Sequence, residues 1–198
     1  PDRATFKSDM EEVDCQVNDS YLYLTEIFTK TNRDLWKEYE NEALDGLGAM
    51  CDRLMQILEQ KSRGYSHYRS LLETEIPLIL GIVPKLKKSS AWKIDFVYCL
   101  FKESRLVKKE LRENGDVNRL LNSLMEQLCA DYENRHIDEE RFYRCKAKNL
   151  ISQSIVWSQS GSDRFQKKAL RNCRKALFWL KNLKGHAGID RDFLLKVN

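Results

Sequence analysis

The side chains that could carry out catalysis or bind a metal are scattered along this chain of 198 residues. The three histidines are His67, His136 and His186, and they lie far apart in the sequence. The nearest approach to a metal-ligand set is Cys129, His136 and Cys145, whose spacing matches no zinc-binding pattern. We therefore expect no metal site and no bound cofactor.

Motifs for nucleophilic or acid–base catalysis are also missing from the sequence. It contains no G-x-S-x-G, no H-E-x-x-H, no EF-hand loop and no Walker lysine. The pair of glycines at Gly46 and Gly48 is too short a motif to hold a phosphate. The adjacent carboxylates of Glu139 and Glu140 point in different directions on a helix, so they form no acid–base pair. These observations predict a non-enzymatic protein without catalytic residues.

The six cysteines indicate the redox environment. They are Cys15, Cys51, Cys99, Cys129, Cys145 and Cys173. No two of them lie within four residues of each other, and most fall on or beside apolar helical stripes. This pattern predicts buried, reduced thiols in an intracellular protein of the nucleus or cytoplasm. The sequence also has no apolar run long enough to span a membrane and no signal peptide, so we expect no membrane partner.

The sequence predicts that the secondary-structure elements carrying these residues are all helices. Only 3 prolines and 8 glycines interrupt the chain, and no alternating strand pattern of useful length occurs. Turn and capping signals at Gly115–Asp116, Asp138 and Gly161–Asp163 predict helices over 116–134, 138–159 and 163–184. Apolar residues surround most of the 138–159 helix, which predicts a central position among several neighbours.

The same reasoning upstream predicts further helices, for a total of seven or eight in an all-α fold. Ser89 and Ser90 are predicted to cap one helix, and an apolar stripe from Leu47 to Leu58 indicates another. Between these two helices, Pro77 and Pro84 should each bend or end the helical segment in which they lie. The spacing favours antiparallel hairpins, either in a globular helical bundle or in a short stack.

One segment carries a resemblance to known repeats. Residues 71–88, LLETEIPLILGIVPKLKK, resemble the apolar, proline-interrupted inner helix of a HEAT or armadillo repeat. The resemblance implies a HEAT/ARM-like stack and, by analogy, protein binding. For the domain organisation we expect an acidic N-terminal extension over 1–18 and a single all-α domain over 19–198, with room for a subdivision near 85–90.

Charge is strongly polarised along the chain. Residues 1–80 carry 9 Lys and Arg against 16 Asp and Glu, whereas residues 81–198 carry 25 against 14. The most basic element is the helix over 163–184, with 8 bases and a single acid, Asp163. At about 100° per residue its apolar half holds Phe165, Ala169, Cys173, Ala176, Leu177, Leu180 and Leu183. A helix with one apolar and one basic side is typical of a surface that binds partners.

The opposite half of this helix is the predicted binding site. Its members are Arg164, Lys167, Lys168, Arg171, Arg174, Lys175, Phe178 and Lys181. Phe178 is the exception among the cations, and three interpretations remain open for it. The ring packs beneath a C-terminal turn at Phe193 and Leu194, anchors a partner protein, or stacks on an unpaired base while the cations meet phosphates.

These patterns rank the functions. The leading prediction is a scaffold or adaptor domain of a larger intracellular protein or complex, whose partner protein presents an acidic and apolar segment to it. The alternative is a helical nucleic-acid-binding domain that uses the basic face over 164–181, although no recognised nucleic-acid-binding signature accompanies the charge.

Overall fold

The computed structural model describes most of the second half of the chain and parts of the first. The described residues are 44–49, 51–52, 54–56, 58–59, 79–103, 115–159 and 161–181. They form helices and connecting turns, and within them no strand occurs, so the predicted all-α fold is confirmed. The chain divides into two compact units, Pro1–Lys88 and Ser89–Asn198, and this boundary falls inside the 85–90 window. Residues 1–18 lie outside the described residues.

In the first unit, the stripe predicted over 47–58 forms a buried helical face. Leu47, Cys51, Leu54 and Leu58 are all buried, as expected from spacings of three and four residues. The lysine at position 88 ties this helix to a later segment of the same unit, since Lys88 Nζ lies 2.6 Å from an oxygen of the Asp52 carboxylate.

The helical residues 79–82 pass directly into a short 3-10 helix, η1 (Val83–Lys85), with proline in its first turn. Because Pro84 has no backbone N–H to donate, the helix cannot continue regularly, as the sequence predicts. Pro77 lies outside the described residues, so the HEAT-like segment is seen only over its second half.

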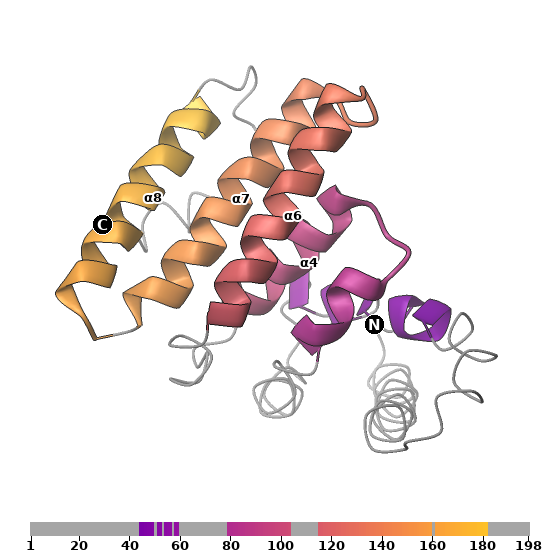
Figure 1. Cartoon of the computed structure of the whole chain (residues 1–198), viewed down its shortest axis with the longest axis horizontal. Coiled ribbons are helices and arrows are strands. Elements are labelled where there is room, and N and C mark those ends of the chain that lie inside the picture. The colour runs from indigo at the N-terminus through magenta and orange to yellow at the C-terminus, as the bar shows by residue number, and fades with distance from the viewer. Residues whose placement is uncertain are drawn as a thin grey trace, which may run out of the picture. The chain divides into compact units, whose positions relative to one another are not determined.

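Within the described residues, the second unit contains four long helices. They are α4 (Ser90–Glu103), α6 (Gly115–Glu133), α7 (Glu139–Ser158) and α8 (Asp163–Lys181). Figure 1 shows α6, α7 and α8 running antiparallel to their neighbours, with α7 in the middle. Because α7 packs against α4, α6 and α8, its predicted central position is confirmed.

Local signals account for the helix ends. Asp138 caps α7, because its carboxylate accepts a hydrogen bond of 2.8 Å from the backbone N–H of Arg141. Ser89 caps α4 in the same way, accepting from the N–H of Trp92 at 3.2 Å. In the turn before α8, Gly161 adopts a φ of 70°, which glycine tolerates without steric cost.

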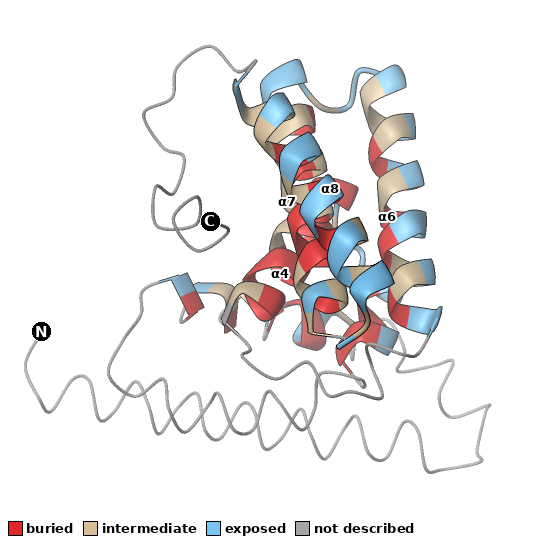
Figure 2. Ribbon diagram, turned by 90° about the vertical axis from the view of Figure 1, so that its left-hand side faces the viewer, coloured by how far each residue is buried: buried red, intermediate tan, exposed pale blue. Residues whose placement is uncertain are grey.

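The core of this unit lies where α4 packs against α6 and α7. Figure 2 shows buried residues concentrated on α4 and α7, and exposed residues along the outer sides of α6 and α8. The largest fully buried side chains of the unit are Ile94, Phe96, Val97, Leu100, Phe101, Leu121, Leu124 and Leu128. These side chains belong to α4 and α6, and α7 packs against both of those helices on one side and against α8 on the other.

Candidate partner-binding surface

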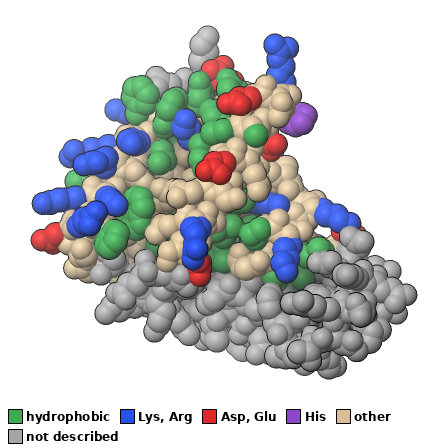
Figure 3. Space-filling view, in the orientation of Figure 1, with side chains coloured by type: hydrophobic (Ala, Val, Ile, Leu, Met, Phe, Trp, Pro, Cys, Tyr) green, Lys and Arg blue, Asp and Glu red, His purple; other side chains and the backbone are tan. Residues whose placement is uncertain are grey.

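The outward side of α8 is strongly basic. Asp163–Lys181 contains seven lysines and arginines and one aspartate. The aspartate lies in the first turn and Lys181 in the last, as the helix dipole favours. Figure 3 shows Lys and Arg side chains gathered over α8 with hydrophobic side chains beside them. We call the eight predicted site residues the α8 outer face: Arg164, Lys167, Lys168, Arg171, Arg174, Lys175, Phe178 and Lys181.

Seven of these eight residues are exposed. Within the described part of the chain, none of the exposed cations forms an ion pair with an acidic residue. Their charge therefore acts outward and is not neutralised within the described fold. Lys168 differs from the others, because it is half-buried with Nζ 5.5 Å from the ring centre of Trp157 and 5.7 Å from that of Phe165.

Two large apolar side chains of α8 face solvent among these cations. Phe178 is 60% exposed and Leu170 is 48% exposed, and among the described residues they are the exposed large hydrophobic side chains. The ring of Phe178 meets that of Trp179 edge-on, with centroids 5.5 Å apart. Phe193 and Leu194, which the sequence offers as a cover for Phe178, lie outside the described residues. Sequence reasoning missed the exposure of Leu170.

The inward side of α8 differs from the predicted apolar half. Its buried residues are Ala169, Asn172 and Ala176, whereas Cys173 and Leu177 are only half-buried. The amide of Asn172 donates a 3.0 Å hydrogen bond from Nδ2 to Oε1 of the Gln153 side chain on α7. The buried line is therefore rotated from the predicted one, because this polar side chain is directed toward α7.

A second polar contact joins the same two helices at close range. The hydroxyl of Ser154 shares its single proton between two backbone oxygens, that of Leu150 at 2.8 Å and that of Ala169 at 3.1 Å. Small residues at the contact let two helices approach closely, which brings such hydroxyls within reach of the neighbouring backbone. Ala169, Asn172 and Ala176 are spaced three and four residues apart, and this helical spacing of small and amide side chains is the sequence signal that could have identified the buried side of α8.

Aromatic contacts clamp the C-terminal end of α8. Trp179 stacks on Tyr143 of α7 with ring centroids 5.2 Å apart, and Lys146 Nζ lies 4.3 Å from the Trp179 ring centre. The same ammonium lies 5.3 Å from the ring of Phe142, which stacks on Tyr132 of α6 at 4.2 Å. These ring contacts hold α8 in the orientation that directs its outer face away from the core.

The buried amide pair leads to a testable stability effect. Asn172→Ala should destabilise the protein by about 1–3 kcal/mol, because the Gln153 amide oxygen is left buried without its donor. Urea denaturation followed by circular dichroism measures the change. Asn122→Ala on the exposed side of α6 is the control, expected to stay within about 0.5 kcal/mol. Equal stabilities of the two variants would contradict the assigned role.

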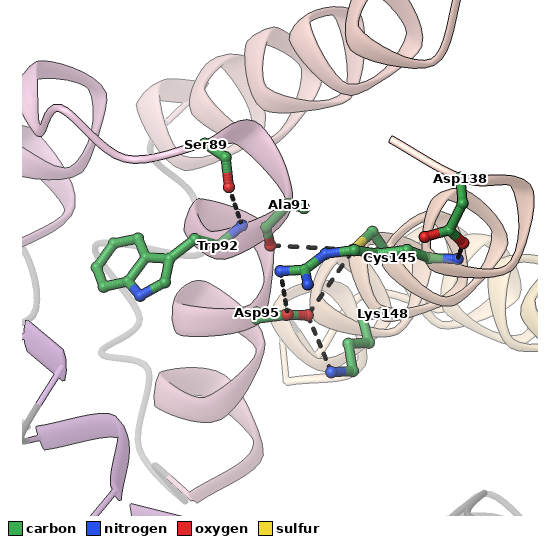
Figure 4. A network of polar contacts seen from close by, with 8 residues as sticks. Ser89, Ala91, Trp92, Asp95, Asp138, Cys145 and Lys148 are labelled. Atoms are coloured by element: carbon green, nitrogen blue, oxygen red, sulfur yellow. Dashed lines mark hydrogen bonds and ion pairs between the residues drawn. The ribbon is translucent and has the colours of Figure 1, made fainter. Parts of the chain in front are cut away.

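Cys145 on α7 lies among polar groups that include residues of α4 (Figure 4). Its Sγ lies 3.9 Å from the backbone oxygen of Ala91 and 3.9 Å from the Asp95 carboxylate. That carboxylate accepts a 2.9 Å hydrogen bond from Lys148 Nζ, and a guanidinium nitrogen of Arg141 approaches to 3.9 Å. Burial raises the pKa of the Cys145 thiol to about 12, and the Asp95 charge adds to the effect. The thiol is therefore protonated and unsuited to nucleophilic attack, and the network joins α7 to α4.

The three residues with the nearest approach to metal-ligand spacing, Cys129, His136 and Cys145, lie in different environments. Cys145 faces α4, whereas His136 is exposed in the turn after α6 and Cys129 is half-buried on α6. Among the described residues no group of three or more histidine, cysteine or acidic side chains is arranged to hold a metal ion. The five cysteines of the described ranges are free thiols. In those ranges, no helix combines the length and apolarity that crossing a membrane requires.

Comparison with known proteins adds no relative to this description. No protein-family model, no curated protein and no solved structure matches the chain.

Proposed function

We propose that this chain is a non-enzymatic protein-interaction domain, a scaffold or adaptor piece of a larger intracellular protein or complex, which binds its partner through the α8 outer face. The observation that carries the proposal is the exposure of Phe178 and Leu170 among outward-directed cations. Exposed apolar side chains within a charged rim are typical of interaction sites. The free thiols suit a location in the nucleus or cytoplasm.

The second candidate function, nucleic-acid binding, draws support from Phe178 and its neighbouring cations. An aromatic ring can stack on a base while Arg174 and Lys175, each one turn away along the helix, contact phosphates. Leu170 weighs against this candidate, because an exposed aliphatic side chain cannot stack on a base in that way and gains most from an apolar pocket on a protein. We therefore favour a protein partner.

Phe178→Ala should weaken partner capture at least tenfold and lower stability by no more than about 1.5 kcal/mol, because the ring is 60% exposed and its contact with Trp179 is edge-on. The measurement is affinity capture from cell extract with the full chain, with and without nuclease, alongside thermal unfolding of the variant. Arg119→Ala on the exposed side of α6 serves as the control surface variant.

The outcomes separate the interpretations of Phe178. Nuclease-resistant capture that depends on Phe178 supports a protein partner, and capture that nuclease removes supports the nucleic-acid candidate. A loss of stability near that of deleting a buried ring, about 3–5 kcal/mol, would show that Phe178 is a structural residue and would contradict the proposal.

A further inference from the structure

Four apolar residues of α8 form a continuous stripe beside the cations. Leu170, Cys173, Leu177 and Leu180 follow one another at intervals of three, four and three residues. Leu170 is exposed and the other three are half-buried, so the stripe is accessible along its length. At about 100° per residue the four side chains fall within an arc of about 80°, and at 1.5 Å per residue they extend over about 15 Å. We call these four residues the α8 seam.

The intervals of the α8 seam are those of a helix-pairing surface. Leu170 and Leu177 occupy the a positions of two heptads, and Cys173 and Leu180 occupy the d positions. Three exposed cations spaced seven residues apart, Lys167, Arg174 and Lys181, then occupy the e positions along one edge. The cations Arg171 and Lys175 lie farther round the helix, beyond Phe178.

Resting on the proposed function, we propose that the α8 seam pairs with an amphipathic helix of the partner protein, whose apolar residues follow heptad spacing and whose flanking positions carry Glu or Asp. The row of three cations selects this charge, since e positions set partner choice through ion pairs across the interface. A second copy of α8 paired antiparallel would bring two such rows together, and the repulsion disfavours it.

The test uses a labelled synthetic peptide of three heptads with Leu at a and d and Glu at e and g. Fluorescence anisotropy with the full chain should show saturable binding that weakens as salt is raised. Two control peptides separate charge from apolar contact. One has Lys in place of Glu and keeps the apolar residues, and the other has Ala in place of Leu and keeps the negative charge. Binding of the alanine peptide with equal affinity would overturn the inference, because charge alone would then explain it.

Variants of the protein locate the peptide on the helix. Leu170→Glu should weaken binding of the acidic peptide at least tenfold, because it places a carboxylate in the apolar stripe opposite other carboxylates. Lys167→Glu should weaken it by about three- to tenfold, whereas the matched reversal Arg119→Glu, at an exposed position on α6 outside the α8 outer face, should change it by less than about twofold. Equal losses for Lys167→Glu and Arg119→Glu would overturn the placement of the peptide on α8.

The cysteine within the seam supplies a second readout. Saturating peptide should slow alkylation of Cys173 severalfold and leave that of Cys129 unchanged, since Cys129 is equally half-buried but lies on α6. Mass spectrometry of the digested protein distinguishes the two thiols. Unchanged alkylation of Cys173 under saturating peptide would overturn the inference.

Failure of this inference and failure of the proposed function give different results. If the acidic peptide does not bind while Phe178→Ala still loses the captured protein, the seam is wrong and the interaction function stands. If a single-stranded oligonucleotide binds in place of the peptide, and nuclease removes all captured material, both are overturned.

Discussion

Charge reversal of Lys167, Arg171 and Arg174 to glutamate should abolish partner capture, with a loss of affinity of about a hundredfold or more. All three side chains are exposed on the outer side of α8, and no ion pair to a described acidic residue neutralises them. The triple variant changes the local charge by six units and places carboxylates against the acidic partner, where like charges cost several kcal/mol in total. Glutamate also has a high helix propensity, so α8 should remain folded.

The measurement is the equilibrium affinity for the captured partner at two salt concentrations, with circular dichroism to verify folding. Reversal of Arg119 on α6 and of Arg135 in the turn after it, both exposed, is the control for a general change in net charge. Undiminished capture by the triple variant would remove the α8 outer face as the binding site. For a nucleic acid, the logarithm of affinity would fall linearly with that of salt, with a slope of about −0.7 per phosphate contact to a single strand.

Removing the ring of Phe142 should produce the largest loss of stability among the site-supporting residues, about 3–5 kcal/mol for Phe142→Ala. Phe142 is only 6% exposed, it stacks on Tyr132 of α6 at 4.2 Å, and its ring lies 5.3 Å from Lys146 Nζ. Its deletion leaves a cavity where α6 meets α7, next to the aromatic contacts that clamp α8.

Urea denaturation of the full chain, fitted with the slope of the parent protein, gives the change in the free energy of unfolding. Phe178→Ala is the matched control, because it removes the same number of atoms from an exposed site on the neighbouring helix. If the two variants lose equal stability, the distinction between supporting and binding aromatic residues is wrong. We also expect Phe142→Ala to weaken capture only where it unfolds the protein.

Local interactions made much of the second unit predictable. Asp138 was expected to open a helix and does so by accepting the N–H of Arg141 three residues later. Gly161 was expected to separate two helices and adopts the positive φ that favours glycine. Because these contacts join residues close in sequence, they can be recognised without knowledge of the fold.

Other features depend on residues far apart in sequence and could not be predicted in this way. The orientation of α8 is an example, because Asn172 is buried through a hydrogen bond to Gln153 on the preceding helix. Plotted on a helical wheel, an asparagine reads as polar and outward-facing, so the predicted apolar half was centred too near Cys173. Trp179 went unnoticed for the same reason, since its partners Tyr143 and Lys146 lie on α7.

The sequence by itself therefore determined that this protein is all-α, where the described helices of its second unit begin, and that one helix concentrates its positive charge. Composition, periodicity and caps are properties of neighbouring residues, and they act before any tertiary contact forms. Only the tertiary structure decided which side of that helix faces outward. It buried Asn172, stacked Trp179 on α7 and left Leu170 with Phe178 in solvent, because packing against α7 sets the rotation of α8 about its own axis.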